Sequence, residues 1–557
     1  MGALLLTLCG RLFYIQILCG DELAEAAASQ YATELIGIDD RGQIFDRDLR
    51  PLTGERYRCY YIIKKALTDD ADLMRLLEEI DAERITAASS RYEVFQSERF
   101  DAEVHKRLQQ EYNAYGFRKR ARYQSDQTAC HLIGYLNEDE QRGVAGLELL
   151  CENRLRSKGG RLILQSDAAG NLLRGIAPRK LRDSDAAFAK NAGEAAGGIR
   201  TTLDIHVQQK CENLLAGLCG ADGSAAGADA AACIVSCADT GEILAAASYP
   251  VFDPERIADY LADDCADDGC LLNRVTQGVY PPGSVFKLAV AAAALENGIC
   301  DASQCFTCCK TAEVEGITLS CSTAGEKGHG SLDMKEAMAV SCNCYFAQLG
   351  DLVGYERILD TARKLGFGEA VLTEFPGEAA GNVPDVRSCG EWDTANLSIG
   401  QGDLLVTPLQ VHRMTSLIAG GEEGGSLRLL YEDSSGRKEQ EGLFDTAAAA
   451  AAPPRQPGRA AISEKTAETL RQLMAEVMKT GTGSRIAWDI PVWGKSGTAE
   501  ASRSGRAVKQ CWFTGFCETD GEKVYVITVL AENGTSGSAA ALPVFRELTE
   551  TLTELRP

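Results

Sequence analysis

Residues 280–295 read YPPGSVFKLAVAAAAL, a chain breaker followed by an almost uninterrupted apolar run. The Pro-Pro-Gly at 281–283 interrupts regular structure, and the residues after it predict a buried helix that ends at Gly298. Ser284 therefore stands at the start of a helix. Lys287 comes three residues later, about one turn further along and on the same face.

This serine and this lysine have the surroundings that a serine nucleophile needs. A helix start offers N–H groups and a positive dipole end to a developing anion. A lysine in an apolar helix should lose basicity through desolvation, which suits a general base. With only five histidines in the chain, a His-based triad is a poor first hypothesis. The structural alternative for Ser284 is a plain N-cap, and a second Ser-x-x-Lys at Ser435 and Lys438 lies in a predicted solvated loop.

Two further short motifs follow in the sequence. Ser341-Cys342-Asn343 comes directly after a helix-like run at 334–340. Residues 493–500 read WGKSGTAE and follow a predicted strand, which puts Lys495 on the sheet side of a cleft. A similar Lys-Thr-Gly-Thr at 479–482 closes a predicted helix, where a cation simply complements the dipole. We therefore take Lys495 as the functional lysine.

The last hundred residues predict a sheet covered by helices. Apolar residues at helical spacing predict a helix at 463–478, with Ser463 as its N-cap. Another helix is predicted from about Pro543 to Leu555. Strand candidates separated by short polar turns lie between them, which suggests antiparallel neighbours: residues 490–493, 511–517 and 524–531. Helices before and after such strands are typical of an α+β fold.

The composition limits the class of protein. A length of 557 residues suggests about three domains, and 45% hydrophobic with 25% charged residues is typical of a globular chain. Lys plus Arg number 57 and Asp plus Glu number 80, so the formal charge is −23. A surface this acidic argues against binding nucleic acid, which needs clustered cations.

The N-terminal part carries weaker signals. Residues 2–18 are apolar but short, with Arg11 in the middle, and they fit either the outer half of a membrane anchor or an amphipathic helix. Residues 37–65 predict strands around a turn, and residues 68–114 predict helices. A domain boundary is expected near 185–205. Loops, linkers or surface insertions are predicted in segments rich in Ala, Gly, Asp or Pro: 183–199, 219–231 and 420–461.

Cysteine usage leaves alternatives open. The chain has 21 cysteines, an odd number, and most are expected to be reduced, buried small side chains. One cluster has ligand types that suit zinc, although its spacing matches no standard finger or ribbon: Cys305, Cys308, Cys309, Cys321 and His329. Zinc, a hairpin disulfide from Cys308 or Cys309 to Cys321, and free thiols all stay open. His329 is expected to shape a turn.

The order Ser-x-x-Lys, Ser-x-Asn, Lys-Ser-Gly-Thr is the active-site set of penicillin-binding proteins and serine β-lactamases. The chain as a whole resembles the class B penicillin-binding proteins, the monofunctional transpeptidases of peptidoglycan synthesis. Segments from one end to the other are similar to those of the family: 11–16 near the anchor, 41–47, 131–135 and 143–148 in the pedestal, and 202–204, 240–245, 398–402 and 407–410 in the catalytic domain.

This resemblance implies an α+β protein in three parts. Residues 1–19 would be a partial transmembrane anchor, truncated at Met1 because the family's anchor begins earlier. Residues 20–198 would form an elongated β-rich pedestal of the dimerisation type. Residues 199–557 would form the penicillin-binding/serine β-lactamase-like transpeptidase domain, an antiparallel sheet covered by helices. The protein would cross the cell membrane once, with its catalytic domain outside the cytoplasm.

The resemblance also implies a mechanism. The substrate would be a peptidoglycan stem peptide ending in D-Ala-D-Ala, and Ser284 would attack its penultimate carbonyl. Lys287 would take the proton of that serine, Ser341 would pass a proton to the leaving amine, and Asn343 would bind the stem amide. Lys495 would supply positive potential. The amine of a neighbouring stem would resolve the acyl-enzyme, whereas a β-lactam would stay attached.

Further residues would bind the substrate. Ser496, Gly497 and Thr498 would hold the terminal carboxylate, and the backbone N–H groups of Ser284 and Thr498 would form the oxyanion hole. The resemblance implies no metal and no cofactor. The expected partners are stem peptides, β-lactams, the membrane and a polytopic membrane glycan polymerase, with no nucleic acid.

Three alternatives share these motifs. A β-lactamase needs a base that activates water, and no convincing Glu-x-x-Leu-Asn element lies between Asn343 and Lys495. It also has no need of the long N-terminal region. A D,D-carboxypeptidase differs only in using water as the acceptor, and the pedestal-like segments argue against it. A non-catalytic cell-wall scaffold has no reason to keep all the motif residues.

Overall fold

The computed structural model describes most of the chain: residues 11, 32–35, 41–85, 91–137, 142–156, 160–165, 179–182, 198–220, 227–262, 269–314, 316–385, 393–431, 461–503, 506–519 and 523–554. The described residues fall into two compact units. The first draws on 1–44, 53–124 and 151–199, and the second on 45–52, 125–150 and 200–557. The predicted division into parts 20–198 and 199–557 stays a prediction.

Several predicted segments lie wholly or mostly outside the described residues. They are the anchor at 1–19, apart from Arg11, the linker at 183–199, and most of the insertion at 420–461, with the second Ser-x-x-Lys inside it. Among the helices that the structure describes, none combines the length and the apolar character that crossing a membrane requires.

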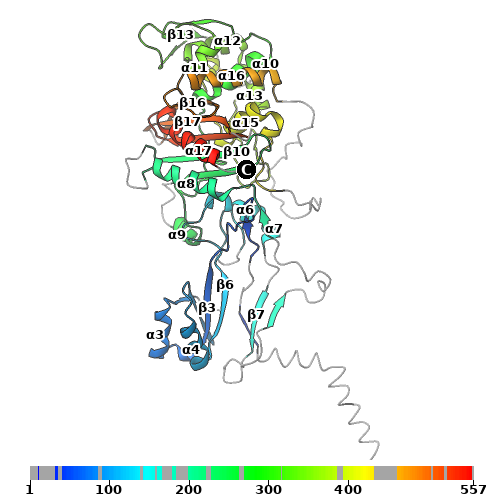
Figure 1. The fold of residues 1–557 in the computed structure, drawn as a ribbon, viewed down its shortest axis with the longest axis vertical. Helices are drawn as coiled ribbons and strands as arrows, with labels where there is room; N and C mark the ends of the chain where they lie inside the picture. Colours follow the sequence, from blue (N-terminus) through cyan, green and yellow to red (C-terminus); the bar gives the residue numbers. More distant parts are fainter. Residues whose placement is uncertain are drawn as a thin grey trace, which may run out of the picture. The chain divides into compact units, whose positions relative to one another are not determined.

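The first unit contains a four-stranded antiparallel sheet in the order β4-β5-β3-β6. Its strands are β3 (Tyr57–Lys64), β4 (Glu83–Ile85), β5 (Tyr92–Ser97) and β6 (Tyr115–Arg120). Helices α3 (Ala71–Glu79) and α4 (Ala102–Tyr112) start at the N-caps Asp70 and Asp101, and their apolar sides pack with the sheet in one core (Figure 1). The prediction of helices across 68–114 was therefore incomplete, because it missed the two strands between α3 and α4.

The other elements of the first unit are short. A three-stranded antiparallel sheet has the order β1-β7-β8, with β1 (Ala32–Leu35), β7 (Gly160–Gln165) and β8 (Arg179–Arg182). The 3-10 turn η2 (Lys65–Leu67) follows β3, and helix α7 (Glu152–Leu155) precedes β7. Strands β2 (Ile44–Phe45) and β9 (Ile199–Arg200) have two residues each. In both strands the first residue belongs to the first unit and the second residue to the second unit.

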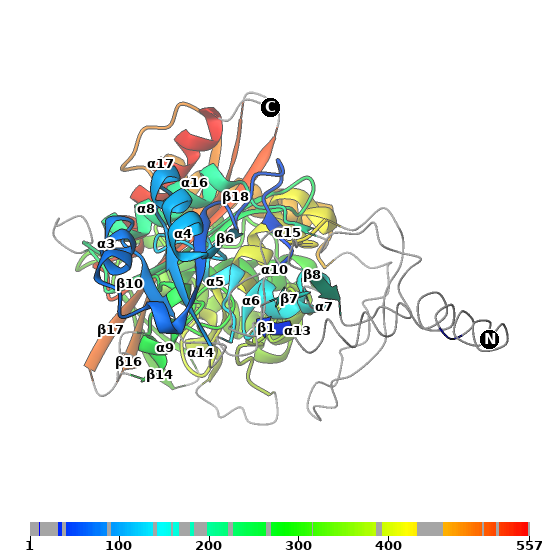
Figure 2. The same ribbon diagram turned by 90° about the horizontal axis from the view of Figure 1, so that it is seen from below.

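The second unit is built on a five-stranded antiparallel sheet in the order β11-β10-β18-β17-β16. The strands are β10 (Ala230–Cys237), β11 (Ile243–Tyr249), β16 (Val492–Arg503), β17 (Arg506–Glu518) and β18 (Val524–Glu532). Figures 1 and 2 both show β16 and β17 side by side, with β16 at the edge of the sheet. The predicted antiparallel sheet is confirmed.

Helices cover both faces of this sheet. On one face, α8 (Ile205–Leu218) and α17 (Leu542–Glu554) share a core with inward residues such as Val235 and Ile527. On the other lie α15 (Pro408–Gly425) and α16 (Glu464–Lys479). His412 of α15 is buried there between the hydroxyl groups of Ser236 (2.7 Å) and Thr528 (3.0 Å). Successive strand residues point to opposite faces, so one face is apolar and the other carries a buried polar layer.

The remaining elements surround the edge strand or connect the others. A helical group contains η5 (Gly283–Phe286), α10 (Lys287–Glu296), α11 (Met334–Ala339), α12 (Asn343–Val353), α13 (Tyr355–Lys364) and α14 (Asp393–Ser398). Two small antiparallel pairs join β12 (Phe306–Cys308) to β15 (Gly330–Leu332) and β13 (Thr311–Val314) to β14 (Ile317–Ser320). The connecting elements are α5 (Cys130–Ile133), α6 (Gly146–Leu150), η3 (Pro254–Arg256), α9 (Ile257–Ala262) and η7 (Gly537–Ala541).

Candidate active site

Ser284 lies in η5, the single 3-10 turn that leads directly into α10, so the predicted helix start is confirmed. The turn is held by a close backbone contact in which Gly283 N donates to Gly400 O at 2.9 Å. A Cβ atom at Gly400, whose φ is +72°, would lie only 2.1 Å from Gly283 O. The segment 398–402, singled out in the sequence, therefore supports the turn that carries the serine. The Ser284 side chain is partly exposed while its neighbours are buried.

Lys287 is the first residue of α10 and is completely buried. Its Nζ donates to Ser341 O (2.8 Å) and to Asn343 Oδ1 (2.7 Å), and lies 3.3 Å from Ser341 Oγ. The first motif thus contacts the second. A neutral amine has two N–H groups and one lone pair. The two carbonyl oxygens can take both N–H groups, which leaves the lone pair for a hydroxyl proton.

Ser341 lies in the turn between α11 and α12 and has a φ of +55°, a left-handed conformation that is uncommon for serine. Strained backbone of this kind is concentrated at functional sites. The Ser341 hydroxyl lies 2.9 Å from Lys495 Nζ, so it stands between the two lysines. Asn343 begins α12, and its Nδ2 donates to Ser320 O at 3.3 Å.

Lys495 is completely buried inside β16, opposite Thr514 of β17, and donates to Ser341 Oγ and to Ser496 O (2.7 Å). Its predicted position after the end of a strand was wrong. Glycine is disfavoured in strands, so the predicted strand was ended before Gly494. In the structure, glycine is needed because neighbours come close. A Cβ atom added at Gly494 would lie 2.6 Å from the Phe513 ring, and one added at Gly497 would lie 3.0 Å from Val285 Cγ1.

The rest of the third motif lines the same edge. The Ser496 hydroxyl is 2.7 Å from Thr482 Oγ1, and the Thr498 Oγ1 accepts a hydrogen bond from Gly537 N at 3.1 Å. Thr498 is exposed and Ser496 is buried. Thr482 belongs to the Lys-Thr-Gly-Thr stretch that we interpreted only as the end of a helix. The contact depends on the tertiary fold, so local sequence carried no signal for it.

We expect Thr482→Val to lower the second-order rate of acylation by a β-lactam about threefold to tenfold. The substitution would remove the hydrogen bond between Thr482 and Ser496, which orients the Ser496 hydroxyl. The net free energy of such a bond is about 0.5–1.5 kcal/mol. Stopped-flow labelling with a fluorescent penicillin measures this rate. Thr480→Val is the matched control, because Thr480 lies in the same stretch but is exposed and bonds to Glu476. Equal rates in both variants would contradict a role for Thr482.

The two lysines shape the electrostatics of the site. Burial lowers the pKa of Lys287 to about 8. Burial, and after it the positive charge of Lys287, hold the pKa of Lys495 well below its usual value. Within the described part of the chain, no carboxylate forms an ion pair with either lysine. Buried positive charge without a counter-ion is costly, so the site favours an anionic ligand that supplies one.

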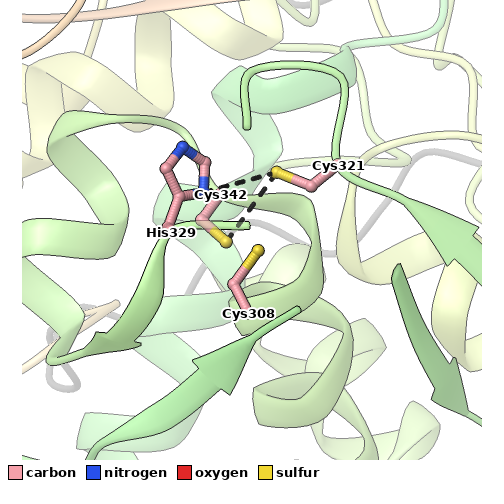
Figure 3. A group of neighbouring side chains, drawn as sticks. All are labelled: Cys308, Cys321, His329 and Cys342. Atoms are coloured by element: carbon pink, nitrogen blue, oxygen red, sulfur yellow. Dashed lines mark hydrogen bonds between the residues drawn. The ribbon is translucent and has the colours of Figure 1, made fainter. Parts of the chain in front are cut away.

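The described cysteines do not form the hairpin disulfide that was one of the three open alternatives (Figure 3). Every cysteine that the structure describes is a free thiol, including Cys308, Cys309 and Cys321. The alternative of a disulfide from Cys308 or Cys309 to Cys321 is therefore wrong in this structure. Cys342, between the two motif residues Ser341 and Asn343, is buried as well.

Comparisons with known proteins identify the family of this chain. The model of the penicillin binding protein transpeptidase domain matches residues 231–550. The peptidoglycan D,D-transpeptidase MrdA of Salmonella typhimurium is 26% identical over 588 aligned residues, which cover 92% of this chain and 88% of that protein.

Solved structures extend the likeness over the whole chain. One, of a peptidoglycan synthase complex that coordinates polymerization and crosslinking, has a TM-score of 0.71 at 25% identity and covers 100% of this chain and 97% of its own. The penicillin-binding protein PBP2 of Helicobacter pylori, solved with MreC, has a TM-score of 0.66 at 22% identity, with 94% and 99% covered. The family match spans more than half of the chain, and the chain therefore belongs to the penicillin-binding protein transpeptidases and is a class B penicillin-binding protein.

Proposed function

We propose that this protein is a peptidoglycan D,D-transpeptidase, which crosslinks stem peptides through an acyl-enzyme on Ser284. The observation that carries the proposal is the Ser341 hydroxyl, which lies within hydrogen-bond reach of both Lys287 and Lys495. It links the three motifs beside a partly exposed serine on a helix start. The serine D-Ala-D-Ala transpeptidase activity agrees with the family and with the named relatives.

The first step is the attack of Ser284 on the penultimate carbonyl of D-Ala-D-Ala. Neutral Lys287 takes the hydroxyl proton through its free lone pair, while Ser341 O and Asn343 Oδ1 hold its N–H groups. An ester to Ser284 forms, and the bond to the terminal D-alanine breaks. The backbone N–H groups of Ser284 and Thr498 would stabilise the oxyanion, and β16 packs close to η5 at Gly497, next to Thr498.

Ser341 would deliver its hydroxyl proton to the leaving amine and would receive in its place the proton that Lys287 took from Ser284. Once Lys287 is protonated, its third N–H group can donate to Ser341 Oγ, as Lys495 does, so the Ser341 hydroxyl proton is free to point at the substrate. Asn343 would bind the amide of the stem with its remaining hydrogen-bonding capacity. The terminal carboxylate of the substrate would supply the missing counter-charge to Lys495 and would be held by Ser496, Gly497 and Thr498.

We also propose the organisation around this chemistry. Residues 20–198 would serve as a pedestal of the dimerisation type and residues 199–557 as the transpeptidase domain. The chain would be anchored in the cell membrane by one span, with the catalytic domain outside the cytoplasm. A polytopic membrane glycan polymerase would be its partner, in line with the polymerization and crosslinking complex of similar fold.

An assay with a D-Ala-D-Ala pentapeptide on glycan strands tests the function. We expect release of D-alanine together with new stem dimers, resolved by liquid chromatography and mass spectrometry, and both products should disappear with penicillin. D-Alanine and tetrapeptides without dimers would indicate a D,D-carboxypeptidase. Rapid turnover of a bound β-lactam would indicate a β-lactamase, and no product with any substrate would favour a scaffold.

A further inference from the structure

The stretch of chain that enters η5 depends on distant residues for its position. Pro281 and Pro282 have no backbone N–H group, so the backbone of these two residues can only accept hydrogen bonds. Pro281 O accepts one from Trp512 Nε1 of β17 at 3.0 Å. Tyr280, just before the prolines, exchanges backbone hydrogen bonds of 2.9 Å with Val406 in both directions. A further anchor of this stretch is the side chain of Tyr280.

The Tyr280 side chain reaches a buried carboxylate. Its hydroxyl donates to Glu532 Oε1 at 2.9 Å, and both residues are buried. The Tyr280 ring stands edge-on to the Trp512 ring, with 6.2 Å between the centroids. A Cβ atom added at Gly278 would lie 2.4 Å from the Tyr280 hydroxyl oxygen, so the chain passes closely over the phenol. The phenol is therefore confined to one orientation.

Arg274 holds the carboxylate that the phenol contacts. Its Nε donates to the same Glu532 Oε1 at 2.7 Å, and its side chain is 1% exposed. The guanidinium is fixed in turn, because its Nη1 donates to Gly269 O at 2.8 Å. Glu532 is the last residue of β18 and pairs with Gln510 of β17 and with Ala230 of β10. The carboxylate thus has a defined place at the end of the central sheet.

Stability alone does not explain such a pair. Removing two charges from water costs about as much free energy as their attraction in the interior provides, and apolar replacements of buried ion pairs are often neutral or stabilising. A hydrogen bond to a charged acceptor is short and directional, and a buried polar network with its partners in place specifies a single arrangement. The arrangement that this network specifies is that of the chain leading to Ser284.

We propose that Glu532 is a positioning residue for the nucleophile, with Arg274 orienting its carboxylate and Tyr280 carrying its position to η5. The inference rests on the proposed function, because it assigns Glu532 to the step in which Ser284 attacks. Glu532 would hold the Ser284 hydroxyl in line with its base and with the oxyanion hole. A displacement of about 1 Å at a reacting atom can lower a rate about 10²-fold.

Tyr280→Phe tests the proposal, because it removes the hydroxyl and keeps the ring against Trp512. We expect the rate constant of acylation at saturating fluorescent penicillin to fall about tenfold. The dissociation constant of the non-covalent complex should stay within about twofold of the wild type. Stopped-flow traces over a range of penicillin concentrations separate the two values. A purely structural loss would lower the amount of folded protein and leave both constants of the folded fraction unchanged.

Tyr260→Phe is the matched control. Its hydroxyl, in α9, accepts a hydrogen bond from Asp253 N at 3.2 Å, so this variant also loses one bond to a phenol. Both constants should equal those of the wild type.

Glu532→Gln shows whether the carboxylate acts through the phenol. Glutamine keeps the shape and an acceptor oxygen but removes the charge, so we expect a fall of about threefold in the acylation rate constant. Added to Tyr280→Phe, the same substitution should have no further effect, because the bond that it weakens is already absent. If Glu532→Gln does not fold, Arg274→Met combined with Glu532→Gln takes its place, since it removes both buried charges.

Defined results would overturn the proposal. They are a wild-type acylation rate constant in Tyr280→Phe, an equal fall in Tyr260→Phe, a weaker complex with an unchanged rate constant, or independent effects of the two substitutions in the double variant. A wild type that no penicillin acylates would overturn the transpeptidase function and this inference with it. A normally acylated wild type that Tyr280→Phe matches would overturn this inference alone.

Discussion

Ser284→Ala is expected to abolish covalent labelling by a fluorescent penicillin while the protein stays folded. In η5 only the Ser284 side chain carries a hydroxyl group that can form the ester, and alanine has none. The other hydroxyl groups of the site are held by hydrogen bonds, Ser341 by the two lysines and Ser496 by Thr482. Removal of a nucleophile of this kind typically costs on the order of 10³–10⁶ in rate.

Peptide mass spectrometry after labelling measures the effect. The wild type should carry a long-lived adduct on the peptide that contains Ser284, and the variant should carry none. Ser303→Ala is the control, because Ser303 is exposed and its hydroxyl donates to the carboxylate of Asp301. It should be labelled like the wild type. An adduct on Ser284→Ala at another serine would refute the assignment of the nucleophile.

The sequence was sufficient where the signals are local. The breaker at 281–283 and the apolar run after it predict η5 and α10, and with them the placement of Ser284 and Lys287 one turn apart. The helix at 463–478 was found for the same reason, since spacing and the N-cap Ser463 lie within a few residues of one another. These features depend on neighbours in the chain.

The sequence failed where distant segments decide the structure. Strand β16 runs through the Lys-Ser-Gly-Thr motif because β17 pairs with it and η5 packs against its glycines, and neither contact is visible locally. Thr482 meets Ser496 across 14 positions, and Cys342 meets Cys321 across 21. Both residues had a simpler local explanation, as a helix end and as the middle of a catalytic motif.

Lys287→Met is expected to lower the acylation rate by about 10² to 10⁴, because it removes the general base and keeps an unbranched side chain in the buried position. The wild-type rate should rise about tenfold per pH unit and level off above pH 8. Burial lowers the pKa of Lys287 from 10.5 to about 8, and the neutral form is the base. At pH 7 Lys287 would be neutral in about a tenth of the molecules, compared with about 0.03% if its pKa stayed at 10.5.

The pH profile separates a catalytic role from a structural one. Lys287→Met should show a flat, low rate across pH 6–9, because no amine remains at the position to titrate. The exposed Lys335→Met, which loses an ion pair to Glu476, should keep the wild-type profile. Methionine removes a costly buried amine but also its hydrogen bonds to Ser341 O and Asn343 Oδ1, so the two contributions to stability oppose each other. We therefore expect melting temperatures within about 5 °C of the wild type, and a pH-dependent rate in Lys287→Met would show that another group is the base.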